Sequence, residues 1–261
     1  ASTDCATCMS FTSPVNKITE FALGISGQPG QALNIDGKDG TCSPITDCSG
    51  GLDNALAPIS ALANGPIVEA LGKADILLLL EHRNFNADGD PYSLVLWDAR
   101  LTGDGCDYQN DSCSFLVAKS SITSSCEPQF HFDNAVINGN KLTAGGGEES
   151  IFVLIPLSAE TLLPLVVEKA TIHGTITMEN GKPSIIDGVI GGAIAKASLV
   201  TAVEAIPLDD FPPEVSKAAV LTLLNLVVKN DIDSNGDGNK DAASVGLPFK
   251  AISASIAGVQ N

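Results

Sequence analysis

The stretch Glu168-Lys-Ala-Thr-Ile-His-Gly-Thr-Ile-Thr-Met178 alternates apolar and polar residues more regularly than any other part of this chain. A period of two residues is typical of a β-strand with one buried face, because successive side chains point to opposite sides of a sheet. The apolar side chains that would share the buried face are Ala170, Ile172, Ile176 and Met178. Asn180-Gly181 follows and favours a tight hairpin turn, so residues 182–186 are expected to form the partner strand.

Further strands and helices are expected on both sides of this hairpin. Strands are expected over residues 18–25, 76–80, 92–101, 130–133, 151–157 and 247–256. Helices are expected over residues 52–71, with interruptions at Pro58 and Gly65-Pro66, over residues 190–206, and from Pro212 to Asn230. Strands dominate and the helices are segregated in sequence. The expected class is therefore β-rich α+β, either an antiparallel sandwich or a barrel-like sheet with two or three packing helices.

A change of composition along the chain suggests how it is divided. Residues 1–51 are polar and rich in Gly and Cys, and they are expected to form a disulfide-containing N-terminal segment. Residues 52–261 are expected to form a single β-rich domain that carries the C-terminal helices and an acidic loop. The longest apolar stretch, residues 188–206, is broken by Lys196 and Glu204, so no transmembrane segment is predicted.

The balance of charge excludes several classes of protein. Lys and Arg number 14 against 31 Asp and Glu, which gives a formal net charge of −17, yet 44% of the residues are hydrophobic. Nucleic-acid-binding proteins neutralise phosphates with Lys and Arg, and anionic membrane surfaces attract the same residues, so neither partner is expected. Disordered acidic chains contain few apolar residues, and this chain has enough of them for a folded core.

The cysteines indicate a set of disulfide bonds. Seven are present, all in the first half of the chain. Two pairs enclose short polar loops and are expected to be bonded: Cys42 with Cys48, and Cys106 with Cys113. Cys5 could pair with Cys8, or one of these two with Cys126. Because seven is odd, one thiol would stay free or link two molecules.

Disulfides form in oxidising compartments, so the protein is expected to be extracellular, at the cell surface or in the periplasm. The chain starts at Ala1 without a basic and apolar leader, which is interpreted as the mature product of signal-peptide cleavage.

The motif with the clearest chemistry in its spacing is the acidic stretch 231–244. Counted from Asp233 as position one, it places Asp or Asn at positions 3, 5, 7 and 9 and glycine at position 6, as in an EF-hand calcium loop. The candidate ligands for Ca²⁺ are Asp231, Asp233, Asn235, Asp237, Asn239, Asp241 and Ser244. Ser244 stands at position 12 instead of the bidentate glutamate of a sensor, which favours a structural site. A solvated acidic turn is the alternative interpretation.

A weaker form of the pattern occurs at residues 84–90. Its candidate ligands are Asn84, Asn86, Asp88 and Asp90, with glycine at position 6. It starts with a neutral residue, and loops with fewer charged ligands bind Ca²⁺ more weakly. A hairpin turn between the strands on either side is the alternative interpretation.

Candidate catalytic groups are few. His131 and Asp133 lie two residues apart on one strand face, but no third ligand lies nearby in sequence. Glu81-His82-Arg83 closes a buried strand, where a salt network at the strand end is the plain interpretation. His173 lies on the polar face of its strand, where a solvated histidine is the plain interpretation.

Three fragments of the chain together resemble a known group of proteins. They are Leu33-Asn-Ile-Asp-Gly37, Gly50-Gly-Leu-Asp-Asn-Ala55, and the acidic loop that runs into Ala243-Ser-Val-Gly-Leu-Pro-Phe-Lys-Ala251. The chain resembles uncharacterised secreted and lipoprotein-like proteins of myxobacteria and related deltaproteobacteria, with one EF-hand or dockerin-like calcium loop. The resemblance implies a location in the cell envelope and no particular activity.

The resulting expectation is a calcium-stabilised structural, assembly or binding protein without catalysis, with other protein subunits as partners. High apolar content with few charges is typical of surfaces that partners cover. A carrier of a lipid or other apolar ligand is the second hypothesis, and a hydrolase that uses His131 with Asp133, or Glu81 with His82, is the third.

Overall fold

The computed structural model describes residues 9–85, 89–103, 107, 113–146, 149–156, 162–207 and 216–260. Eight antiparallel strands of this described part close a barrel. They are β1 (Val15–Phe21), β2 (Leu78–Arg83), β3 (Tyr92–Leu101), β5 (His131–Asn138), β6 (Lys141–Gly145), β8 (Leu162–Glu179), β9 (Lys182–Ala195) and β10 (Ala242–Val259). Each pairs with the next, and β10 returns to β1. The expected β-rich fold with a barrel-like sheet is confirmed.

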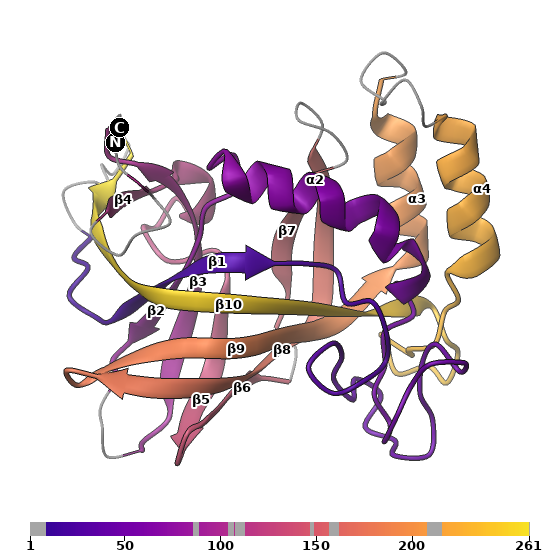
Figure 1. Ribbon diagram of the computed structural model, residues 1–261, viewed down its shortest axis with the longest axis horizontal. Helices are drawn as coiled ribbons and strands as arrows, with labels where there is room; N and C mark the ends of the chain where they lie inside the picture. Colours follow the sequence, from indigo (N-terminus) through magenta and orange to yellow (C-terminus); the bar gives the residue numbers. More distant parts are fainter. Residues whose placement is uncertain are drawn as a thin grey trace.

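Two further strands extend this barrel. β7 (Ile151–Pro156) pairs with the first part of β8 and forms a hairpin beyond the barrel wall. β4 (Ser114–Val117) lies antiparallel to the end of β3 and parallel to the end of β10. Through β4, the strands β1, β2, β3 and β10 also close a second and smaller circuit. Figure 1 shows β1, β10, β9 and β8 side by side along the barrel wall.

The alternating stretch 168–178 lies in β8. Its apolar residues Ala170, Ile172 and Ile176 are buried as expected, whereas Met178 is 47% exposed near the tip of the hairpin. The register of β8 against β9 shifts between Glu168 and Thr171, and Lys169 between them has φ 51°. This bulge separates the part of β8 that pairs with β7 from the part in the barrel wall.

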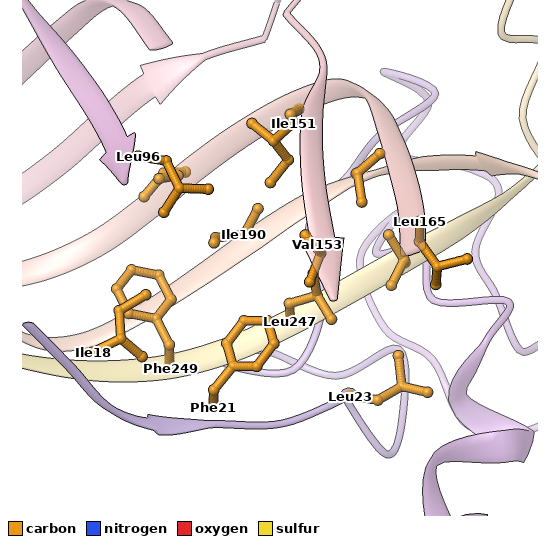
Figure 2. Packing of buried hydrophobic residues seen from close by; sticks show 14 of the residues in the cluster. Ile18, Phe21, Leu23, Leu96, Ile151, Val153, Leu165, Ile190, Leu247 and Phe249 are labelled. Carbon is orange, nitrogen blue, oxygen red and sulfur yellow. The ribbon is translucent and has the colours of Figure 1, made fainter. Parts of the chain in front are cut away.

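The main hydrophobic core fills the barrel. It contains Ile18 and Phe21 from β1, Ile190 from β9, and Leu247 and Phe249 from β10. Figure 2 shows these side chains pointing into one space together with Leu96, Ile151, Val153 and Leu165. The strands of the barrel thus fill its interior with their own side chains.

A smaller core lies inside the second circuit of strands. It is built from the opposite faces of the shared strands and includes Leu79, Val95, Trp97, Phe115 and Val117. Phe11 packs edge-on against Trp97 with ring centroids 6.0 Å apart. Neighbouring residues of β2 and β3 thus enter two different cores, which explains why apolar side chains occur on both faces of these strands.

Helices cover one side and one end of the barrel. η1 (Ala57–Ile59) leads into α2 (Ser60–Gly72), which runs without a break through Pro66, contrary to the predicted interruption. α3 (Lys196–Ala205) and α4 (Lys217–Val227) stand together at the end of the barrel, while α2 lies across the edge of β1 (Figure 1). A short turn, η2 (Lys119–Ser121), follows β4. No helix of the described residues is long and apolar enough to span a membrane.

The prediction of a helix over residues 190–206 is wrong for its first part. Residues 190–195 continue β9, and only Lys196 starts the helix. The glycines that made this stretch resemble a helix of small residues are required by close packing in the sheet. A Cβ on Gly191 would lie 2.8 Å from Ile35 Cδ1, and one on Gly192 would lie 2.4 Å from Val167 Cγ1. The small residues thus allow other segments to approach the sheet instead of forming a helix face.

Two other boundaries also differ from expectation. β10 spans Ala242–Val259, which is longer than the expected strand 247–256, because its two halves serve both circuits of strands. β1 starts at Val15 and ends at Phe21, three or more residues before the expected strand 18–25 at each end. Residues 1–51 therefore contribute one strand to the barrel wall.

Candidate functional site

The acidic loop expected to bind calcium projects from the start of β10. Ile232 and Ala242 form an isolated antiparallel bridge, in which each backbone N–H donates to the carbonyl of the other at 3.0 and 3.1 Å. Residues 233–241 form the loop between them. Gly236 and Gly238 have φ values of 78° and 91°, a conformation that favours glycine. The bend therefore needs glycine at position 6, as the motif predicts.

Asp233 organises the loop from position one. Its carboxylate accepts hydrogen bonds of 2.8, 3.2 and 2.8 Å from the backbone N–H groups of Gly236, Asp237 and Gly238. Asn235 Oδ1 accepts from Asp237 N at 2.9 Å, and Asp237 Oδ1 accepts from Asn239 N at 2.8 Å. These turns hold the side-chain oxygens of positions 1, 3 and 5 in place before any ligand binds.

The other acidic candidates serve as braces at the base of the loop. Asp241 accepts from the backbone N–H of Ser234 at 2.8 Å and from its hydroxyl at 3.2 Å. The N–H of Ser234 holds the pKa of the Asp241 carboxyl below its usual value. Asp231 accepts from the N–H of Ser244 at 2.7 Å and from its hydroxyl at 2.6 Å. Both carboxylates thus connect the two sides of the loop at its base.

The donor set fits a hard cation in part. Carboxylate oxygens of Asp233 and Asp237, the amide oxygen of Asn235 and the carbonyl of Asn239 are the ligand types that Ca²⁺ prefers, and each oxygen has two lone pairs. Ser244 at position 12 is fully buried, and its hydroxyl also accepts from Ala55 N at 2.8 Å. No group of three His, Cys, Asp or Glu side chains that could hold a metal occurs in the described residues, so amide and carbonyl oxygens are needed.

The loop is attached to two distant parts of the barrel. Lys169 Nζ, at the bulge of β8, donates to the carbonyl of Asp233 at 3.1 Å. The Asp231–Ser244–Ala55 chain of hydrogen bonds reaches the segment before η1. A cation held in the loop would therefore stabilise contacts between segments that are far apart in sequence.

The second candidate loop is described only at its ends. Asn84 has φ 61° and Gly89 has φ 85°, as in a turn between β2 and β3. Asn86 and Asp88 lie outside the described residues, and Asp90 already interacts with another group of the protein. Tyr92, at position 9, is buried in the barrel.

One of the expected disulfides is present among the described residues. Cys42 and Cys48 are bonded, with Cα atoms 5.8 Å apart. Cys113 and Cys126 each take part in a disulfide as well. Cys5, Cys8 and Cys106 lie outside the described residues, and with them the expected Cys106–Cys113 pair.

His82 belongs to a buried polar network in the barrel. Its Nε2 lies 2.8 Å from Asn16 Oδ1, and its Nδ1 lies 2.9 Å from the Tyr92 hydroxyl. Because Asn16 Oδ1 only accepts, Nε2 carries the proton and the Tyr92 hydroxyl donates to Nδ1. Burial lowers the pKa of His82 to about 3 and raises that of Tyr92. The ring is therefore neutral and fully hydrogen-bonded at physiological pH.

Glu81 lies on the opposite face of β2 from His82. Its carboxylate, 1% exposed, accepts from Trp97 Nε1 at 3.0 Å and from Arg83 at 3.2 Å in the smaller core. The two side chains are thus directed into separate cores, and the geometry does not bring them together for catalysis.

The other histidines lie on the outer surface. His131 Nε2 is 3.7 Å from Asp133 Oδ2, and both side chains are about half exposed, at 47% and 59%. His173 faces a trough of about 1160 Å³ on the outside of the sheet, and partial burial lowers its pKa. In the same trough, Lys250 pairs with Glu20 at 3.0 Å and Lys141 donates to Thr175 at 2.8 Å.

An apolar cavity of about 60 Å³ lies beneath the helices. Side chains from α2, α3, α4 and the β7–β8 hairpin line it, among them Ala63, Leu165, Val203 and Leu224. Pockets for small molecules usually measure about 300–1000 Å³. The lining of the cavity is apolar, as expected for a carrier of an apolar ligand, but its volume is smaller than that of a usual ligand pocket.

Comparisons with protein-family models, with curated proteins and with solved structures find no match to this chain. Sequence reasoning found the acidic loop because its candidate ligands are contiguous. It missed a hollow at the barrel mouth lined by Asp98, Arg100, Phe130 and Phe152, because these residues come from separate segments without a shared motif.

Proposed function

We propose that this chain is an extracellular or cell-surface binding or assembly protein without catalysis, whose barrel is stabilised by Ca²⁺ held in the loop 233–241. The observation that carries the proposal is the arrangement around Asp233, which places oxygens of positions 1, 3 and 5 on consecutive turns. The disulfide Cys42–Cys48 supports an oxidising location. The neutral, fully bonded His82 supports a structural role for the most buried histidine.

Calcium titration of the full chain tests the metal part of the proposal. Thermal unfolding in EDTA and in millimolar CaCl₂ should differ, because an ion that binds only the folded state stabilises it by about 2.7 kcal/mol at one hundred times its Kd. The double variant Asp233→Asn with Asp237→Asn should lose this difference and the heat of calcium binding.

The variant Asp133→Asn provides a matched control. It removes one exposed carboxylate on β5, which is outside the loop, and it should keep the full response to calcium. A wild-type chain that shows neither a calorimetric signal nor a shift in Tm would refute the calcium site.

Assembly requires a separate measurement. Light scattering with and without EDTA and reductant should reveal larger species under native conditions if the chain works through other subunits. A strict monomer under all conditions would remove the assembly role and leave a role in binding.

We propose carriage of an apolar ligand as the second candidate. The cavity under α4 has an aliphatic lining, which supports this candidate. Leu224 is the one buried residue among the described side chains of this apolar helix. At about 60 Å³ the cavity would have to widen through an outward movement of α4. Native mass spectrometry of gently extracted protein should then detect a bound lipid, and protein without any adduct would count against carriage.

A further inference from the structure

A hollow of about 330 Å³ opens where β2 and β3 leave the barrel. Leu96 belongs to the main core, and the next two side chains on the same face of β3 are Asp98 and Arg100. On β2, Leu78 pairs with Asp98 and packs against the same core. The floor of the hollow is thus the apolar end of the barrel interior, and its wall turns polar toward the solvent. Barrel mouths are preferred positions for ligand sites, and this volume lies within their usual range of about 300–1000 Å³.

An aromatic pair forms another part of the wall. Phe130, just before β5, and Phe152, on β7, are stacked with ring centroids 6.2 Å apart and planes inclined by 11°. Phe152 is 37% exposed, although it is a large apolar side chain. An exposed aromatic face beside a hollow offers a flat surface with a negative quadrupole, to which C–H groups of a ligand are attracted.

Asp98 and Arg100 form a fixed pair of acceptor and donor in the hollow. Arg100 Nη1 donates to Asp98 Oδ1 at 2.7 Å, and the Ser120 hydroxyl donates to Asp98 Oδ2 at 3.3 Å. The backbone of Asp98 is held by Ser121 Oγ, which accepts from its N–H at 2.8 Å. A guanidinium has five N–H donors and a carboxylate about four acceptor positions, so both groups keep capacity for a ligand. Adjacent hydroxyl groups, which both donate and accept, match such a pair.

The charge of the hollow selects against anions. Asp75 and Asp98 face one cation, Arg100, within a chain of net charge −17. An anionic ligand would be repelled, whereas a neutral ligand rich in hydroxyl groups would not. A saccharide ring combines an apolar C–H face with neighbouring hydroxyls at its edge.

We propose that this hollow binds one ring of a neutral saccharide. The C–H face of the ring would lie against Phe152, and two adjacent hydroxyls would bond to the carboxylate of Asp98 and the guanidinium of Arg100. The inference refines the proposed binding function by naming a ligand class, and it does not depend on calcium in the loop 233–241.

Saturation-transfer NMR of the full chain with a panel of neutral hexoses, N-acetylhexosamines and their disaccharides tests the proposal. At least one sugar should bind, and calorimetry should then show affinity at least tenfold weaker in Phe152→Ala and in Asp98→Asn. Leu226→Ala is the matched control, because Leu226 is also an exposed large apolar side chain, lies on α4 and does not line the hollow. Its affinity should equal that of the wild type.

Several results would overturn the proposed saccharide site. Absence of binding for the whole panel at millimolar concentrations, or equal binding in all variants, would overturn the proposal. Binding of charged sugars or of free aromatic amino acids in place of neutral sugars would overturn it as well. If Phe152→Ala unfolds, Phe152→Leu keeps the apolar volume but removes the aromatic face, and it should still weaken binding tenfold. Repeating the titration in EDTA distinguishes failure of this site from failure of the calcium loop.

Discussion

At the scale of single residues, two buried polar groups respond to pH in opposite directions. His82 has a pKa depressed to about 3, so it contributes stability that is lost as the pH falls from about 6.5 toward 3. Asp53 is 2% exposed, and burial raises the pKa of its carboxyl to about 6, although the backbone N–H groups of Ile35 and Asp36 oppose the shift. Its folded pKa exceeds the unfolded one, so its contribution to stability is present at low pH and is lost above about 6.

Replacing Asp53 with asparagine should therefore stabilise the protein at alkaline pH. Asparagine keeps an oxygen that can accept from Ile35 N, which now bonds Asp53 Oδ2 at 3.0 Å, and it removes the buried charge. The free energy of unfolding in EDTA should rise on the order of 1–3 kcal/mol at pH 8 and change little at pH 4. Urea unfolding at both pH values measures this. Asp133→Asn, at an exposed site, should show no such pH dependence, and an equal effect of Asp53→Asn at both pH values would contradict the assignment.

The hydroxyl of Tyr92 should be needed for stability as well. In Tyr92→Phe, Nδ1 of His82 would lose its donor inside the barrel while the ring packing stays, at a cost of about 1–3 kcal/mol. Chemical unfolding at pH 7.5 measures the loss. Unchanged stability would mean that another group satisfies His82 Nδ1.

At the scale of elements, α3 and α4 cap each other. Lys196, the first residue of α3, donates to the carbonyls of Asn225 and Val228 at the end of α4, at 3.2 and 2.8 Å. Lys217, the first residue of α4, donates to the carbonyls of Glu204 and Ile206 at the end of α3. Each ammonium thus satisfies carbonyls that have no partner within their own helix, at the negative end of the helix dipole.

Removing either lysine should loosen both helices. Lys196→Met and Lys217→Met keep the long apolar stem and should each lower stability by about 0.5–2 kcal/mol. Hydrogen exchange should accelerate at the ends of α3 and α4 before it accelerates in the barrel strands. Lys119→Met, at an exposed lysine on η2, is the control, and exchange that is unchanged in α3 and α4 would show that water replaces the caps at no cost.

At the scale of the whole molecule, two hydrophobic cores share four strands. Leu94 of β3 lies in the main core, whereas Val95 and Trp97 of the same strand lie in the smaller one. Because β1, β2, β3 and β10 belong to both circuits, neither core can open without disturbing the pairing that supports the other. The molecule should therefore unfold as one cooperative unit.

Leu94→Ala tests this coupling. The variant removes a fully buried side chain from the main core and should cost about 2–5 kcal/mol. The chain has a single tryptophan, Trp97, whose fluorescence reports on the smaller core, while far-UV circular dichroism reports on all strands. Both probes should shift to the same lower urea midpoint. Separate transitions for the two signals would show that the cores unfold independently.

The sequence alone determined the local features of this protein. The alternation in residues 168–178 predicted a strand with one buried face, and the spacing of Cys42 and Cys48 predicted their disulfide. The glycines of the acidic loop adopt the bend that the motif requires. Such features are set by neighbouring residues, because turn conformation, period of two and short loop closure depend on local backbone geometry.

The tertiary structure decided everything that depends on distant segments. Gly191 and Gly192 look like a helix of small residues in sequence, but Ile35 and Val167 approach so closely there that only a glycine strand fits. The hollow at the barrel mouth brings Asp98 of β3 near Phe152 of β7, two residues without a common motif. Closure of the barrel pairs β10 with β1, whose residues are more than 200 positions apart in the chain. Such pairing depends on how complementary surfaces pack and is not encoded in any local pattern.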